Sequence, residues 1–184
     1  MKRILIGSVL AAVVLFLWGF VFWGLSGVSN AVMGPVPDEA ALSQKLSEAL
    51  PRSGVYLLPY PPAQPTEEFM KRHRAGPLAQ IFYRREGADP MGGGVFAAGF
   101  LHMFVSVLVM AIALNLVRPA TSSYGARVKL VLVAGLAGAI YSNLGKPIWW
   151  HQSWEYHLLG FVYDFTSWVL AGLVLARFVR NGGA

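Results

Sequence analysis

Four long apolar stretches constrain the fold of this 184-residue chain more than any other feature. Each is close to the ~20 apolar residues that an α-helix needs to cross a hydrocarbon core ~30 Å thick. The composition agrees, because 55% of the residues are hydrophobic, more than in ordinary soluble domains. The sequence therefore predicts a polytopic membrane protein with four transmembrane helices. The stretches cover roughly residues 4–25, 95–117, 128–147 and 156–178.

Basic residues beside these stretches predict the orientation of the chain. No acidic residue accompanies them. Because basic loops are retained in the cytoplasm, both termini and the 118–129 loop are expected to be cytoplasmic. Residues 28–94 and the 146–155 loop are then periplasmic or extracellular, in a bacterial-type inner (plasma) membrane. The flanking residues are Lys2, Arg3, Arg118, Arg127, Lys129, Arg177 and Arg180.

The positive charge of the chain does not indicate a nucleic-acid partner. The formal net charge is +6 and the isoelectric point is about 9.8. Residues 28–94 contain seven basic and seven acidic residues, so the excess lies near the ends of the apolar stretches and is an orientation signal. The chain has no cysteine. Disulfides, thiolate metal sites, iron–sulfur clusters and covalently attached haem are therefore excluded.

The first apolar stretch allows two interpretations, a retained anchor or a cleaved signal peptide. Small residues at 29–31 would suit a signal peptidase. However, the stretch is longer than the ~7–15 residues of a signal-peptide core, and Trp18 and Trp23 resemble interfacial anchors. We expect residues 1–27 to be a retained transmembrane helix.

Residues 28–94 have the pattern of a small α+β unit. Asp38 and Thr66 are suitable N-caps for two short helices. Two short apolar stretches bounded by Gly and Pro predict strands. A core of this size is marginal alone, so we expect the unit to rest on the outer ends of the helices or on a partner. The expected elements are a helix at 39–50, a strand at 54–59, a helix at 67–74 and a strand at 78–85.

The resulting fold class is an all-α polytopic membrane protein with a small extracytoplasmic α+β insertion between the first and second transmembrane helices. Its expected parts are the first transmembrane helix (1–27), the insertion (28–94) and a three-helix transmembrane unit (95–184).

Small and polar residues recur at helical spacing in the last three apolar stretches. Such stripes let helices approach closely in lipid. We therefore expect these three helices to pack through the stripes, with the first helix at the edge of the bundle. The stripe residues are Gly99, Ser106, Gly135, Gly138, Ser142, Gly160 and Ser167.

His102 and Asp164 are ionisable residues deep within two of these stretches. Such residues are costly in a membrane and usually have a partner or a function. The two are expected at similar depth, which predicts a His102–Asp164 pair assisted by Tyr141, Ser142 or Asn143. The alternative is that the pair only locks the bundle or lines a packing defect.

His151, Glu155 and His157 form a polar group above this pair. Together with His102 they could ligate zinc, copper, iron or haem, because imidazole and carboxylate suit these metals. Their order matches no established metal motif. The alternative is an aromatic belt at the membrane interface with polar companions. The belt residues are Trp149, Trp150 and Trp154.

Three functions are compatible with these features. The favoured one is a non-catalytic accessory or assembly subunit of a larger membrane complex, with the bilayer and other membrane proteins as partners and no cofactor. The sequence contains no hydrolase motif and no paired outer carboxylates that would favour an enzyme. The second is a redox or metal-binding protein that holds haem or a metal ion through His102, His151, Glu155 and His157. The third is a proton or small-solute pathway through His102 and Asp164.

Overall fold

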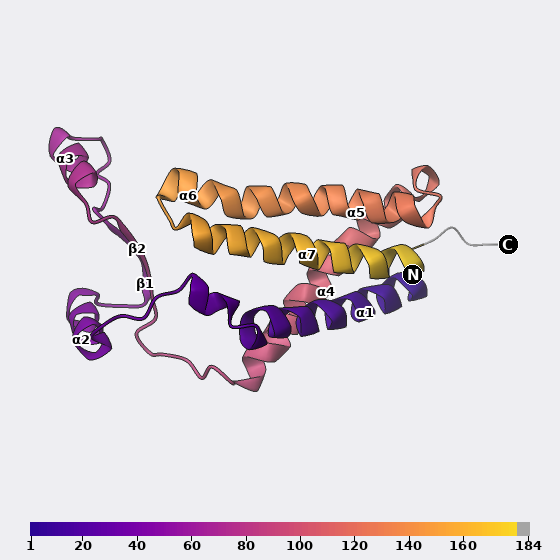
Figure 1. Cartoon of the computed structure of the whole chain (residues 1–184), viewed down its shortest axis with the longest axis horizontal. Helices are drawn as coiled ribbons and strands as arrows, with labels where there is room; N and C mark the ends of the chain where they lie inside the picture. The colour runs from indigo at the N-terminus through magenta and orange to yellow at the C-terminus, as the bar shows by residue number, and fades with distance from the viewer. Residues whose placement is uncertain (180–184) are drawn as a thin grey trace. The chain divides into compact units, whose positions relative to one another are not determined.

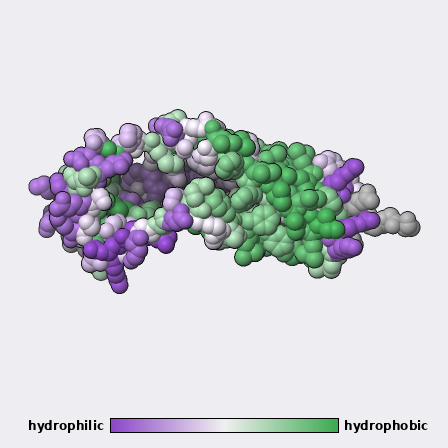
Figure 2. All heavy atoms as spheres, turned by 90° about the horizontal axis from the view of Figure 1, so that it is seen from below, coloured by the Kyte–Doolittle hydropathy of each residue, from purple (hydrophilic) through white to green (hydrophobic). Residues whose placement is uncertain are grey.

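The structure is a computed structural model that describes residues 1–179, apart from the side chain of Arg118; the flanking residue Arg180 lies outside this range. It is mostly helical, and four helices are long and apolar enough to cross a membrane, as predicted. Figure 2 shows the continuous apolar surface over these helices. The candidate spans are Lys2–Leu25, Gly93–Leu116, Tyr124–Trp150 and Trp154–Phe178.

Two of the four spans contain a π-helical turn. The first consists of α1 (Lys2–Gly19) and a π-helical segment, Phe20–Leu25. A short 3₁₀ turn, Val28–Ala31, follows it. The second and fourth spans are the uninterrupted helices α4 (Gly93–Leu116) and α7 (Trp154–Phe178).

The third span is longer than predicted. After a 3₁₀ turn at Arg118–Ala120, α5 (Tyr124–Ala139) leads into a π-helical turn, Ile140–Leu144, and then α6 (Gly145–Trp150). The predicted stretch ended at residue 147, but Pro147 lies in the first turn of α6, where its missing N–H is tolerated.

The first span has a different position in the bundle from the one predicted. α7 packs against α5 and α1, and α1 also packs against α4, so α1 lies inside the bundle (Figure 1). The prediction that the first helix lies at the edge is wrong. The reason is a small-residue face on α1 that allows close approach of its neighbours. Its fully buried members include Ser8, Ala11 and Ala12.

Aromatic side chains join α1 to α7 and α4. Trp18 Nε1 donates a hydrogen bond to Thr166 Oγ1 (3.1 Å). The ring of Tyr163 lies 5.2 Å from that of Phe22, and Phe16 packs edge-on against Phe100 of α4. Trp18, interpreted from the sequence as an interfacial anchor, therefore contributes to the contact between helices.

Residues 35–89 form a separate compact unit. Its helices are α2 (Glu39–Ala49) and α3 (Glu67–Ala75), and its strands are β1 (Gly54–Leu58) and β2 (Ala79–Tyr83). The strands pair antiparallel, with Gly54 opposite Tyr83 and Leu58 opposite Ala79. The predicted α-β-α-β order is confirmed, with each boundary within two residues.

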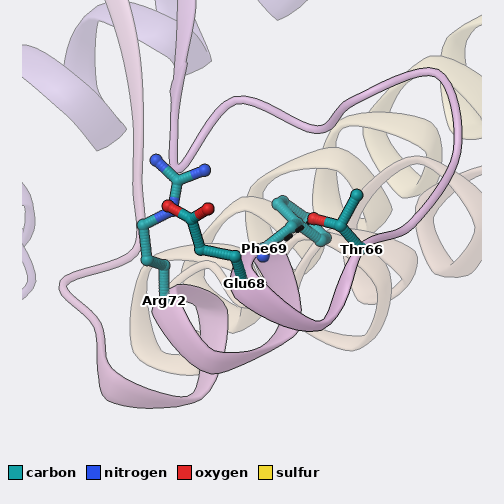
Figure 3. Close-up of polar contacts among 4 residues, drawn as sticks. All are labelled: Thr66, Glu68, Phe69 and Arg72. Carbon is teal, nitrogen blue, oxygen red and sulfur yellow. Dashed lines mark hydrogen bonds and ion pairs between the residues drawn. The ribbon is translucent and has the colours of Figure 1, made fainter.

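Local capping explains where both helices of this unit begin. Asp38 accepts a hydrogen bond from the Ala41 amide (2.9 Å), and Thr66 accepts one from the Phe69 amide (3.1 Å). Figure 3 shows the start of α3, including the Glu68–Arg72 ion pair at 3.8 Å, one helical turn apart. Both predicted N-caps are confirmed.

Polar side chains, rather than a core, hold the unit together where β2 ends. Arg85 Nη1 donates to the carbonyls of Ser47 (3.0 Å) and Leu50 (3.1 Å) at the C-terminal end of α2. Ser53 Oγ donates to Glu86 Oε2 (2.6 Å) and accepts from the Arg85 amide (2.9 Å). These bonds join the chain before β1 to the chain after β2.

We expect Ser53→Ala to raise the pKa of Glu86 towards its ordinary value. The Ser53 hydrogen bond is the main cause that lowers this pKa, and the Glu86 amide and Arg84 act in the same direction. A carboxyl whose pKa is lowered by folding stabilises the fold above its unfolded pKa of about 4.3, and the contribution is lost as the pH falls through the lower folded value. Carbon-13 NMR titration of the side-chain carboxyl measures the shift. Ser47→Ala is the control, and an equal shift in both variants would contradict this assignment.

Candidate functional site

A polar cluster within the apolar helices lies between α7 and the π-helical turn of the third candidate span. Asp164 Oδ2 accepts hydrogen bonds from Asn143 Nδ2 (2.7 Å) and Ser142 Oγ (3.3 Å). Asn143 Nδ2 also lies 3.0 Å from Ser142 Oγ and 3.1 Å from the Ala139 carbonyl. We call Asp164, Ser142 and Asn143 the carboxylate cluster.

Two backbone features make this cluster possible. The π-helical turn has more residues per turn than an α-helix, so consecutive residues such as Ser142 and Asn143 diverge less around the axis and both reach α7. Gly160 lies one helical turn before Asp164. A Cβ at Gly160 would come within 2.6 Å of Asn143 Oδ1, so only glycine leaves room for this amide.

The carboxylate cluster is accessible at the surface of the helical unit, which consists of residues 1–34 and 90–179. Asp164 and Asn143 are half-buried and Ser142 is exposed. Asp164 lies about 15 Å along α7 from Trp154, at ~1.5 Å per residue. Within residues 1–179, the hydrogen-bond donors to this carboxylate are neutral and no ion pair involves it. An ionisable group at this depth is costly in lipid unless something else covers it.

His102 does not join this cluster. It is exposed on α4, which packs mainly against α1. No hydrogen bond or ion pair in the described part of the chain links His102 to Asp164. The physical reason is that α1 lies between α4 and α7. The sequence correctly indicated Ser142 and Asn143 as companions of Asp164, but the structure does not bring His102 to them.

The stretch from His151 to His157 forms a turn and a helix start. His151 adopts a left-handed backbone conformation (φ 52°) where α6 ends. Ser153 accepts a hydrogen bond from the Tyr156 amide (3.2 Å) and donates to Glu155 (2.8 Å). His157 Nε2 lies 2.6 Å from Gln152 Oε1. These side chains therefore stabilise the connection between α6 and α7.

The candidate metal ligands are not gathered into a ligand set. Among the residues that the structure describes, no three His, Asp or Glu side chains lie close enough to hold a metal ion. His102, on α4, is in any case on a different helix from Glu155 and His157. The candidate anchors Trp149, Trp150 and Trp154 are exposed beside this turn, as is typical of an aromatic belt.

The small residues of the predicted stripes divide into two groups. Gly135 contacts Trp168, Gly160 contacts Asn143, and Ser167 is buried with its hydroxyl bonded to the Tyr163 carbonyl (2.7 Å). By contrast, a Cβ at Gly99 or Gly138 would meet nothing within 4 Å. Ser106, in α4, donates to the His102 carbonyl (2.9 Å).

Arg127 has a structural role that the sequence did not predict. The sequence indicates it only as part of the orientation signal. Its side chain is 5% exposed; Nε donates to the Ala176 carbonyl (3.0 Å), and Nη1 donates to the carbonyls of Thr121 and Ser122 (both 2.9 Å). The guanidinium therefore joins the 118–129 loop to the end of α7. One signal was available, because Arg127 shares a helix face with Gly135.

Comparison with known proteins reveals no relative from which a function could be transferred. No protein-family model matches the chain, and no curated protein or solved structure is detectably similar to it.

Proposed function

We propose that this protein is a non-catalytic accessory or assembly subunit of a larger membrane protein complex. The observation that supports this most directly is the exposure of the 35–89 unit. Its helices are capped and its strands are paired, yet none of its residues is buried. An ordered unit without a buried core is the expected form of a segment that docks on another protein.

Residues 35–89 bury little apolar area for a unit that must be stable by itself. A two-stranded sheet is marginally stable at best in water, and small units without disulfides or metals rarely bury enough apolar surface. The paired strand residues Val55 and Phe82 are 56% and 73% exposed. Burial of this pair against a partner would supply part of the missing hydrophobic stabilisation.

The proposed setting is a bacterial-type inner membrane, with both termini in the cytoplasm and residues 28–94 periplasmic or extracellular. The four apolar helices support a multi-pass membrane protein. The basic residues support the orientation, because Lys2, Lys129 and Arg177 lie near the helix ends on the side proposed to be cytoplasmic.

We expect the wild-type chain, expressed at its native level, to be extracted in mild detergent with a stoichiometric partner protein. Val55→Thr combined with Phe82→Thr should release that partner, because threonine keeps the strand propensity but removes apolar contact area. Size-exclusion chromatography with mass analysis would detect the loss.

Met70→Gln is the matched control, because it removes an exposed apolar side chain from α3 and leaves the strand pair intact. It should retain the partner. Extraction of the wild-type chain from native membranes in a particle that contains no other protein would refute the accessory role. Equal partner retention by the strand variant and the control would refute docking through the strand pair.

A further inference from the structure

His102 and Asp164 are two ionisable side chains deep in the apolar helices, and neither has an ionic partner in the described part of the chain. The imidazole of His102 is exposed on α4. Asp164 Oδ2 is bonded by Ser142 and Asn143, while the hydrogen bonds described for this carboxylate leave Oδ1 available. A donor and an acceptor are thus both presented at the surface of the helical unit.

The two residues lie at a similar level of the bundle. His102 is about 13 Å along α4 from Gly93, and Asp164 is about 15 Å along α7 from Trp154. Direct contacts agree with this estimate. A Cβ at Gly19 of α1 would lie 2.9 Å from Tyr163 Oη and 3.5 Å from Met103 Cε, and these are the residues next to Asp164 and His102.

The similar depth of His102 and Asp164 allows them to meet in a symmetric dimer. Two copies of one membrane protein share the same orientation, so a two-fold axis between them is perpendicular to the bilayer and keeps every residue at its own depth. Residues of different type can meet across this axis only if their depths match. A two-fold contact also forms each pair twice, because residue i meets j and j meets i.

We propose that the chain forms a two-fold dimer in the membrane, in which His102 of each copy bonds Asp164 of the other. The imidazole N–H donates to the free carboxylate oxygen, which satisfies both costly groups. The dimer is independent of the accessory role proposed above.

Two open glycines provide space for this contact. Gly99 lies one helical turn before His102, and Gly138 lies one turn before Ser142. A Cβ at either glycine would meet nothing within 4 Å, so the helix backbone is uncovered beside His102 and beside Ser142 of the carboxylate cluster. Small residues at such places let a helix of a second copy approach closely.

Cysteine cross-linking in membranes tests the dimer directly, because the chain has no cysteine of its own. Leu101→Cys is placed in one tagged copy and Tyr141→Cys in a second copy with a different tag. These residues neighbour His102 and the carboxylate cluster and are 58% and 90% exposed. We expect a cross-link between the two tags. Leu17→Cys on α1, also 58% exposed, replaces Leu101→Cys in the control and should give none.

A charge exchange tests the pairing itself. His102→Asp or Asp164→His alone should lower the cross-linking yield about tenfold or more, because two interhelical polar contacts are lost in each dimer. The double exchange places Asp opposite His again and should restore the yield. Absence of the wild-type cross-link, or an equal yield in the Leu17 control, would overturn the dimer. A yield that the single exchanges do not change would overturn the pairing.

Discussion

Replacement of Arg127 by methionine is expected to lower the free energy of unfolding of the helical unit by about 2–5 kcal/mol. Methionine keeps much of the volume but removes every donor. The carbonyls of Thr121, Ser122 and Ala176 would lose the guanidinium that they share. Because Arg127 is buried, water does not readily replace these bonds. Unfolding by a denaturing detergent, followed by circular dichroism, measures the change.

Lys129→Met is the matched control for Arg127. Lys129 lies on the same helix and carries the same charge, but it is exposed. Both substitutions remove one basic residue from the orientation signal, so only the loss of hydrogen bonds distinguishes them. The control should unfold like the wild type. Equal effects of the two substitutions would show that Arg127 acts only through its charge. Arg127→Lys should be intermediate, because one ammonium cannot reproduce the planar fork of a guanidinium.

Gly135→Ala is expected to destabilise the contact between α5 and α7 by about 3 kcal/mol. The added Cβ would overlap the Cβ of Trp168. A change of side-chain rotamer cannot relieve this clash, because a Cβ is fixed to its own backbone. The helices must move apart, and the packing along their interface is lost. Detergent-induced unfolding again gives the free energy.

Gly125→Ala provides the control for Gly135 on the same helix. A Cβ at this position would meet nothing within 4 Å, so alanine adds no clash. Its higher helix propensity should leave the stability unchanged or raise it by up to about 1 kcal/mol. A loss of stability as large as that of Gly135→Ala would contradict the packing described here.

Sequence patterns predicted the local elements well. The N-caps Asp38 and Thr66 and the four apolar spans follow from neighbouring residues and from hydropathy, which do not depend on distant contacts. The end of the third span was missed because the π-helical turn before Pro147 has no clear signature in a single sequence.

The candidate site was predicted in part. Asp164, Ser142 and Asn143 were expected together because the polar stripes of the last three spans were expected to face one another. His102 was expected beside them because it lies at a similar depth in the second span and the first helix was placed at the edge of the bundle. The small residues of α1 place it between α4 and α7 instead, and this separates His102 from Asp164 within one chain.

By itself, the sequence determined the number of apolar helices, the α-β-α-β order of the inserted unit and the positions of His102 and Asp164 along their helices. These properties depend on hydropathy, helical rise and capping, all of which are local. Only the tertiary structure decided which helices are neighbours, and with that the different roles of similar residues. Arg127 and Lys129 are both basic, and Gly135 and Gly138 are both small, yet only one residue of each pair lies in a contact between helices of the same chain. The physical reason is that packing depends on the direction of each helix face, which three-dimensional contacts alone establish.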